Sequence, residues 1–326
     1  MRGKNSVFRH TLQMVINQIV PASEMEEEIG PGEFESRLLA LAKAGRKAKA
    51  LMWFSMAVFV LWFFAFSIAL SMQLTPWLAC TIVLPFFTVF VFVVKWLQVS
   101  TSIKRLVAGS MVRDALSEAF ELTSYEPECH IDRAQIEPTR LIEKWDDIFG
   151  SDLVRGTYKG VAFAFSDIIL LETTEDSDGD TQHKTKFSGQ WLVCTLQKEI
   201  PEPLRLREGR RKSDMETENA AFNKKFQILT RDPHTAFYVL TPHFMDYILA
   251  MDRQADARTY LCFSGRQAHV AFHNKKRNLF EVNTRKLRNE NDIALLRGQI
   301  KQEAKYMTDI IDELLRNQYL FGTEEK

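Results

Sequence analysis

The sequence predicts an α+β protein in which a two-helix transmembrane hairpin precedes a cytoplasmic, mostly antiparallel β-sheet domain with flanking helices. Two apolar stretches, Leu51–Met72 and Pro76–Leu97, stand almost back to back. From about Leu153 onward the apolar residues follow the shorter period of β-strands. A long amphipathic segment, Asn289–Leu320, then predicts a C-terminal helix. Sequential strands with helices mainly at the ends are typical of the α+β class.

Each apolar stretch is long enough to cross a membrane, because about 20 helical residues span a hydrocarbon core of roughly 30 Å. The first stretch carries no charge, and the second carries only Lys95, at its far end. The alternative is a buried helical pair, but a core helix is seldom apolar on every side over such a length. Trp77 and Trp96 lie where rings prefer the headgroup region, and Pro85 predicts a bend.

Basic residues flank both stretches, and the turn between them has none. The flanking residues are Arg37, Lys43, Arg46, Lys47 and Lys49 on one side and Lys95, Lys104, Arg105 and Arg113 on the other. The positive-inside bias therefore predicts a multi-pass protein with both termini in the cytoplasm. The charged first 50 residues argue against a signal peptide.

Helices are expected on both sides of the hairpin. Val7–Val20 has one apolar face, which would lie on the membrane surface or pack on the rest of the protein. A helix that begins near Glu33 is expected to run into the first span as one rod. Thr101–Leu122 also has helical periodicity. Five parts of the chain are therefore predicted: N-terminal cytoplasmic helices (1–50), the transmembrane hairpin (51–97), a juxtamembrane helix and linker (98–140), the α+β domain (141–286) and the C-terminal amphipathic helix (287–326).

The sheet is expected to form around a hairpin of Val161–Leu171 and Lys184–Lys198, joined by the acidic turn Glu175–Asp180. Gly156–Gly160 predicts a turn before it. Further strands are expected at Leu204–Leu206, Lys225–Thr230, Thr259–Phe263, Ala268–His273 and Leu279–Val282. Thr241–Met251 predicts a helix, because Thr241 suits an N-cap and proline follows it. The final helix is expected either to dock on its own domain or to pair as a coiled coil.

Composition and motifs exclude several classes of site. Lys and Arg number 42, as do Asp and Glu, so there is no overall basic excess that would predict a nucleic-acid partner. The four cysteines form no CxxC pair, which argues against a zinc ribbon or a dithiol redox site.

His269 and His273 are about 13 Å apart along a strand, too far to share a metal. Counted from Asp176, the calcium-loop positions 6 and 12 are Thr181 and Phe187, which do not fit. No metal, cofactor or catalytic residue is therefore predicted.

The concentrations of basic residues are interpreted as contacts to lipid headgroups, with a solvated surface as the alternative. The residues assigned to these contacts are Arg46, Lys47, Lys49, Lys95, Lys104, Arg105, Arg205, Arg207, Arg210, Arg211 and Lys212. The lipid bilayer is therefore the first predicted partner.

Several spaced motifs are interpreted as fold residues: Asp152–Gly156, Tyr158-x-Gly160-x-x-Phe163-x-Phe165, Phe187-x-Gly189, Phe222-x-x-x-Phe226 and Leu240–Pro242. With these motifs, the stretch Arg140–Val282 resembles a bacterial family of membrane proteins, domain-of-unknown-function family 3137. The resemblance implies a layout of helices, two spans and this domain in the bacterial inner membrane. It implies no activity.

Three functions remain open at this level. The favoured one is a binding or scaffold module that displays the cytoplasmic domain at the membrane to a protein partner. The alternatives are a membrane-tethered enzyme with an unrecognised site, and a structural subunit that acts through its two spans. Homo-oligomers would fit the last, because small residues such as Ala57, Ala65 and Ala69 allow helices to approach closely.

Overall fold

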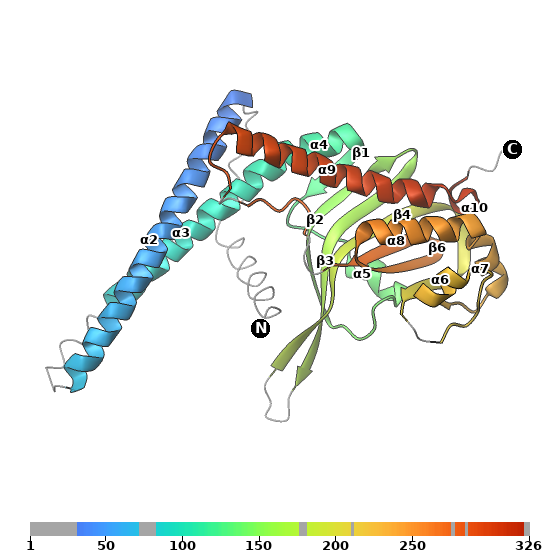
Figure 1. Cartoon of the computed structure of the whole chain (residues 1–326), viewed down its shortest axis with the longest axis horizontal. Coiled ribbons are helices and arrows are strands. Elements are labelled where there is room, and N and C mark those ends of the chain that lie inside the picture. Colours follow the sequence, from blue (N-terminus) through green and yellow to red (C-terminus); the bar gives the residue numbers. More distant parts are fainter. Residues whose placement is uncertain are drawn as a thin grey trace. The chain divides into compact units, whose positions relative to one another are not determined.

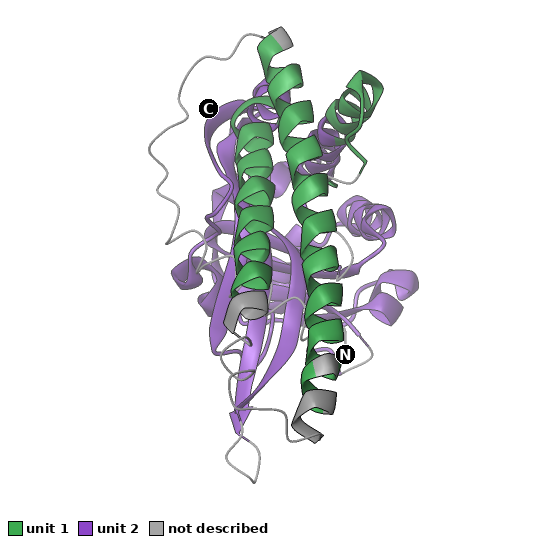
Figure 2. Ribbon diagram, turned by 90° about the vertical axis from the view of Figure 1, so that its left-hand side faces the viewer, with its two compact units in different colours: residues 1–111, 282–299 green, residues 112–281, 300–326 purple. Residues whose placement is uncertain are grey.

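The computed structural model describes residues 31–71, 83–175, 181–209, 212–274, 278–283 and 286–322 (Figure 1). The predicted helix Val7–Val20 and the predicted acidic turn lie outside these residues, the turn except for Glu175. The chain divides into two compact units, which are described separately (Figure 2). Unit 1 contains Met1–Met111 and Val282–Gln299, and unit 2 contains Val112–Glu281 and Ile300–Lys326.

Unit 1 is built on two long helices, α2 (Pro31–Ser71) and α3 (Val83–Val107), which lie side by side (Figure 2). The predicted single rod from near Glu33 into the first apolar stretch is confirmed. Buried apolar residues occur in the first part of α2 and the last part of α3, among them Phe34, Leu38 and Ile103. The bend expected at Pro85 remains a prediction, because the residues just before Val83 lie outside the described part.

The helix predicted for Thr101–Leu122 ends slightly early. After α3 the chain passes through a π-helical turn, Ala108–Val112, into α4 (Arg113–Ala119). Phe120 is extended and leads into a strand, β1 (Glu121–Glu126), that the sequence did not predict.

Unit 2 contains a six-stranded sheet in which every pairing is antiparallel. This confirms the predicted fold class. The strands after β1 are β2 (Asp147–Tyr158), β3 (Val161–Glu175), β4 (Thr181–Glu208), β5 (Phe226–Leu229) and β6 (Arg258–His273). The order is β1-β2-β3-β4-β5, with β6 also paired to β4.

The long strand β4 connects the parts of the sheet. Its first half pairs with β3, from Phe163↔Cys194 to Glu175↔Thr181, as the predicted hairpin requires. Its second half pairs with β5, and β6 follows β4 on both sides of Ile200. Beyond Leu171, where β2 pairing ends, β3 and β4 continue as a projecting two-stranded ribbon (Figure 1).

Short helices surround this sheet. They are α5 (Arg133–Ile136), the 3₁₀ turn η3 (Glu137–Thr139), α6 (Ala220–Lys225), α7 (Pro233–Val239) and α8 (Pro242–Ala255). α8 confirms its predicted start, because the Thr241 side chain accepts a hydrogen bond from the Phe244 amide. α8 approaches β6 through the rings of Phe244 and Phe263, whose centroids are 6.0 Å apart.

The C-terminal helix is also shorter than predicted. α9 (Glu290–Leu315) stops before Asn317, which caps a separate short helix, α10 (Gln318–Phe321). Asn317 is buried, and its amide nitrogen donates to the Val239 carbonyl at 2.9 Å. Leu314 is buried, and so is Ile311, as expected of a helix that docks with one face.

The separate strand expected at Leu204–Leu206 is part of β4. Three further local predictions were wrong. Thr259–Phe263 and Ala268–His273 are one strand, β6, in which Gly265 has a φ of 55° opposite Ile200 and forms an irregularity rather than a hairpin turn. Gly156 lies inside β2, and the turn is limited to Lys159 and Gly160, whose positive φ values suit a two-residue hairpin.

The third error is the predicted strand Leu279–Val282, which is not a strand. The carboxylates of Asp167 and Glu303 accept the amides of Leu279 and Phe280, both at 2.6 Å. These side chains therefore satisfy the backbone in place of a neighbouring strand.

The centre of the sheet is an aromatic and aliphatic core. Phe187 and Trp191 are fully buried and meet edge to face, with ring centroids 5.5 Å apart. Phe165, Phe222 and Phe226 are buried as well. The interpretation of the motif phenylalanines as fold residues is therefore confirmed.

Gly189 provides a test of how closely β4 and β6 approach. A Cβ atom at this position would lie 1.9 Å from the Phe272 carbonyl oxygen, so Gly189→Ala forces the backbone to move. We expect a loss of about 2 kcal/mol in the free energy of unfolding. Gly298→Ala is the control, because Gly298 is in α9 and a methyl group added there would have no atom within 4 Å; it should stabilise by up to about 1 kcal/mol. Chemical unfolding of the full chain in mild detergent measures both, and a Gly189→Ala chain as stable as the parent would contradict the packing.

Candidate functional site

The most unusual surface of unit 1 is the apolar belt, defined as the large exposed apolar side chains of α2 and α3. Its members are Leu51, Trp53, Phe54, Met56, Val58, Val60, Leu61, Phe63, Phe64, Phe87 and Phe90. Phe54 and Leu61 are each 69% exposed. Only 6% and 11% of the residues in the most apolar segments of the two helices are buried, and both helices are long and apolar enough to cross a membrane. Exposed apolar surface of this extent marks a place where something other than water makes contact.

Basic side chains lie on both helices next to the apolar belt, and we call Lys47, Lys49 and Lys95 the basic collar. The Lys49 ammonium lies 5.6 Å from the centre of the Trp96 ring. This contact puts Lys49 of α2 level with Lys95 and Trp96 of α3. Lys43, Lys47 and Lys95 are exposed. The structure therefore brings together three of the predicted lipid contacts, Lys47, Lys49 and Lys95, at the boundary of the apolar belt.

The other predicted lipid contacts are placed differently. Arg205 and Arg207 belong to strand β4. Arg205 donates to the Thr139 carbonyl at 2.6 Å, and Arg207 contacts the Glu143 carboxylate and the Arg140 carbonyl. The two arginines therefore fix the end of η3 and the residues after it to the sheet. Lys212 is exposed, whereas Arg210 and Arg211 lie outside the described residues.

The cations of unit 1 that are not in the basic collar have different surroundings. Arg46 donates to the Leu287 carbonyl, within the same unit. Lys104 is exposed and Arg105 half-buried, further along α3 from the apolar belt. Their contact with headgroups stays a prediction.

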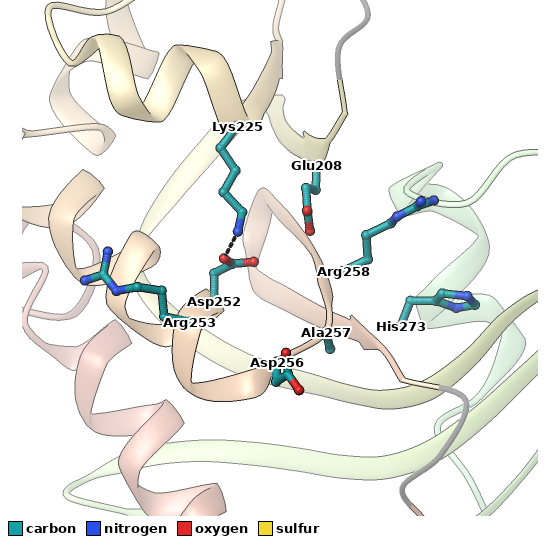
Figure 3. Close-up of a pocket in the computed structure, with 8 residues that line it drawn as sticks. All are labelled: Glu208, Lys225, Asp252, Arg253, Asp256, Ala257, Arg258 and His273. Carbon is teal, nitrogen blue, oxygen red and sulfur yellow. Dashed lines mark ion pairs between the residues drawn. The ribbon is translucent and has the colours of Figure 1, made fainter.

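Unit 2 contains a polar cleft of about 740 Å³ beside the end of α8 (Figure 3). Its lining residues are Glu208, Lys225, Asp252, Arg253, Asp256, Ala257, Arg258 and His273. The Lys225 ammonium forms an ion pair with the buried Asp252 carboxylate. The second carboxylate oxygen of Asp252 has no hydrogen-bond partner among the described residues.

The polar cleft contains a structural ion pair, and charged side chains of both signs surround it. Glu208 accepts the Thr259 amide at 3.1 Å and so contributes to the start of β6. Within the described residues, no group of three His, Cys, Asp or Glu side chains is placed to hold a metal. The side chains of both signs that line the cleft favour no one charge of ligand.

The two histidines of β6 do not share a site. His269 is buried; its Nδ1 atom accepts from the Trp191 indole at 3.3 Å, and its Nε2 atom lies 3.3 Å from the Gln267 amide oxygen. The His273 Nδ1 atom instead accepts the Ser188 amide. Burial lowers the pKa of His269 to about 4, so its ring is neutral at neutral pH.

The buried cysteines are also structural. Burial raises the pKa of Cys194 to about 12 and that of Cys262 to about 11. Both thiols therefore stay protonated and unreactive at neutral pH.

Unit 2 also exposes two aromatic side chains of α7, Phe237 and Tyr238, and we call these two residues and Tyr319 the aromatic cluster. Phe237 is 50% exposed and Tyr238 is 52% exposed. The rings of Tyr238 and Tyr319 stack with centroids 5.8 Å apart, and the Lys198 ammonium lies 5.2 Å from the centre of the Tyr319 ring. The sequence did not predict this cluster, because it gave no sign of α7, which carries two of the three residues.

Residues 182–316 match the family model described as protein of unknown function (DUF3137). The chain resembles this family. The match begins in β4 and ends after α9, so it extends past Val282, where the resemblance drawn from the motifs stopped. It confirms the resemblance over β4 to α9.

No curated protein matches the sequence. A solved structure, the crystal structure of the mycobacterial trehalose monomycolate transport factor A, is similar with a TM-score of 0.32 and 10% sequence identity. The similarity covers 65% of this chain and 96% of that chain.

The buried ring of His269, which lies within the residues that match the family model, should make the stability of the fold depend on pH. Its pKa in the folded state is about 4, below the ordinary value of 6.5, so the unfolded chain takes up this proton at higher pH. The stabilisation is therefore complete above pH 6.5 and is lost as the pH falls toward 4. The loss should reach about 3 kcal/mol.

Chemical unfolding of the full chain across this pH range measures the effect. His269→Gln should flatten the curve, because glutamine takes up no proton. If the parent and the variant show the same pH dependence in this window, the buried neutral ring does not contribute as described.

Proposed function

We propose that this chain is a membrane-anchored protein of the bacterial inner membrane, with two spans and both termini in the cytoplasm. The observation that carries the proposal is the apolar belt of α2 and α3, bordered on one side by the basic collar. A water-soluble pair of helices would bury such side chains, whereas a bilayer solvates them directly. The positive-inside bias then favours a cytoplasmic position for the basic collar and for both long arms.

The length of α2 supports the proposed membrane span. From Leu51 to Ser71, at 1.5 Å per residue, the helix covers about 30 Å, the thickness of a hydrocarbon core. Lys49 lies just before this segment with its charge over Trp96, as expected of an interfacial pair. The part of α2 before Lys49 would then stand in the cytoplasm.

We further propose that unit 2 acts as a binding module for a protein partner. The aromatic cluster supports this role, because tyrosine and phenylalanine are enriched in protein interfaces and supply rigid contact area. Tethering to a membrane would raise the local concentration of the module for partners at the same surface.

Membrane insertion is tested by placing a charge in the apolar belt. Leu61→Asp puts a carboxylate near the middle of the proposed span, at a cost of about 3 kcal/mol for insertion. Leu295→Asp is the control, because Leu295 is 67% exposed but lies on α9. We expect the parent and the control to stay in membranes washed with alkaline carbonate, and a smaller fraction of Leu61→Asp to do so. Release of the parent chain by carbonate would contradict the anchor.

Partner binding is tested with a photocrosslinking amino acid in native membranes. Placed at Phe237, it should give a discrete adduct that Tyr238→Ser weakens at least several-fold, since the two residues are exposed neighbours on α7. The same group at Leu295 is the control and should not give that adduct. The absence of any adduct specific to position 237, or its persistence in Tyr238→Ser, would count against the binding role of this cluster.

A further inference from the structure

The cations next to the apolar belt lie on stretches of α2 and α3 that contain no carboxylate. After Glu35, α2 contains no Asp or Glu, and α3 contains none at all. In the described part of the chain, Lys43, Lys47, Lys95 and Lys104 form no ion pair. Lys43 and Lys47 are also four residues apart on one helix, a spacing at which like charges repel. An external anion would relieve this repulsion.

The two helices place these charges at a defined level. Lys49 lies over Trp96, and a Cβ atom on Gly45 would be 3.3 Å from Val99, so the register between α2 and α3 is fixed at two points. Lys47, Lys49 and Lys95 therefore form a band at the edge of the apolar belt. Lys104 follows Lys95 by nine residues, which is about 14 Å along the helix and beyond the screening length of roughly 8 Å in physiological salt.

We propose that the basic collar is a binding site for anionic phospholipid headgroups. The site combines ammonium groups for a lipid phosphate, the Trp96 ring at headgroup depth and the adjoining apolar belt for acyl chains. A soluble phosphate compound would use the cations alone and would leave the belt uncovered. The combination of charge and apolar surface therefore favours a lipid.

Only some of the basic residues of the chain belong to the proposed lipid site. Arg205 and Arg207 are held by acceptors within unit 2, and Lys104 lies too far from the apolar belt, so none of these is part of the site. Selectivity for anionic lipid should depend on Lys47 and Lys95 in particular.

The test uses the full chain in bicelles of equal parts phosphatidylcholine and phosphatidylglycerol, with retained lipids counted by native mass spectrometry. We expect the parent to retain phosphatidylglycerol preferentially, and Lys47→Gln/Lys95→Gln to lose about fivefold in preference for each cation removed. Lys104→Gln/Lys224→Gln removes the same charge from two exposed lysines elsewhere and should keep the parent's preference.

Three results would overturn the proposal: no preference in the parent, an unchanged preference in Lys47→Gln/Lys95→Gln, or complete displacement of the lipid by inorganic polyphosphate. The inference rests on the proposed membrane anchor, but the two fail differently. A chain that resists carbonate and shows no lipid preference keeps the anchor and loses the site. A chain that carbonate releases loses both.

Discussion

The exposure of the apolar belt is the constraint on which the other features of unit 1 depend. Each large side chain left in water forgoes roughly 2 kcal/mol of burial free energy, and α2 alone exposes several of them, such as Phe54, Leu61 and Phe64. Packing within the unit does not remove this cost, because the buried residues occur in the first part of α2 and the last part of α3. The arrangement is favourable where other apolar groups cover these side chains, as the proposed bilayer would. In that proposal the basic collar marks where the hydrocarbon ends.

Unit 2 follows a different principle, in which one strand holds the domain together. β4 exchanges its neighbour from β3 to β5 along its length while β6 stays beside it. Trp191 of β4 is at the centre of the resulting core, and its indole is bonded to the buried ring of His269. The polar groups buried in this domain, including Asp167 and Asn317, mainly hold backbone amides and carbonyls of neighbouring segments. They serve the fold, so the binding role proposed for this domain rests on its surface.

Composition and local period were enough to predict the long rod of α2, the β3–β4 hairpin and the start of α8. Each depends on residues close in sequence, such as Thr241 and Pro242 at the start of α8. The errors arose where distant residues decide. Gly265 suits a hairpin turn as well as an irregular strand, and only pairing with Ile200 distinguishes them. Leu279 was expected in a strand, but the carboxylate of Asp167 accepts its amide.

The candidate sites show the same difference between features set by neighbouring residues and features set by distant ones. The basic collar was predictable because its lysines flank an apolar stretch in the sequence. Arg205 and Arg207 belong to an equally basic stretch, yet carbonyls of Thr139 and Arg140 hold them, and no local pattern shows this. The aromatic cluster was missed because α7 is too short to show a helical period, and Tyr319 joins it from the far end of the chain.

The central claim is that a bilayer covers the apolar belt, and collision accessibility of a spin label tests it most directly. Leu61 and Leu295 are equally suited to labelling, because they are 69% and 67% exposed. In the full chain reconstituted in vesicles, a label at position 61 should collide with oxygen and be shielded from a water-soluble nickel complex. A label at position 295 should show the reverse. Ready access of the nickel complex to position 61 would contradict the account.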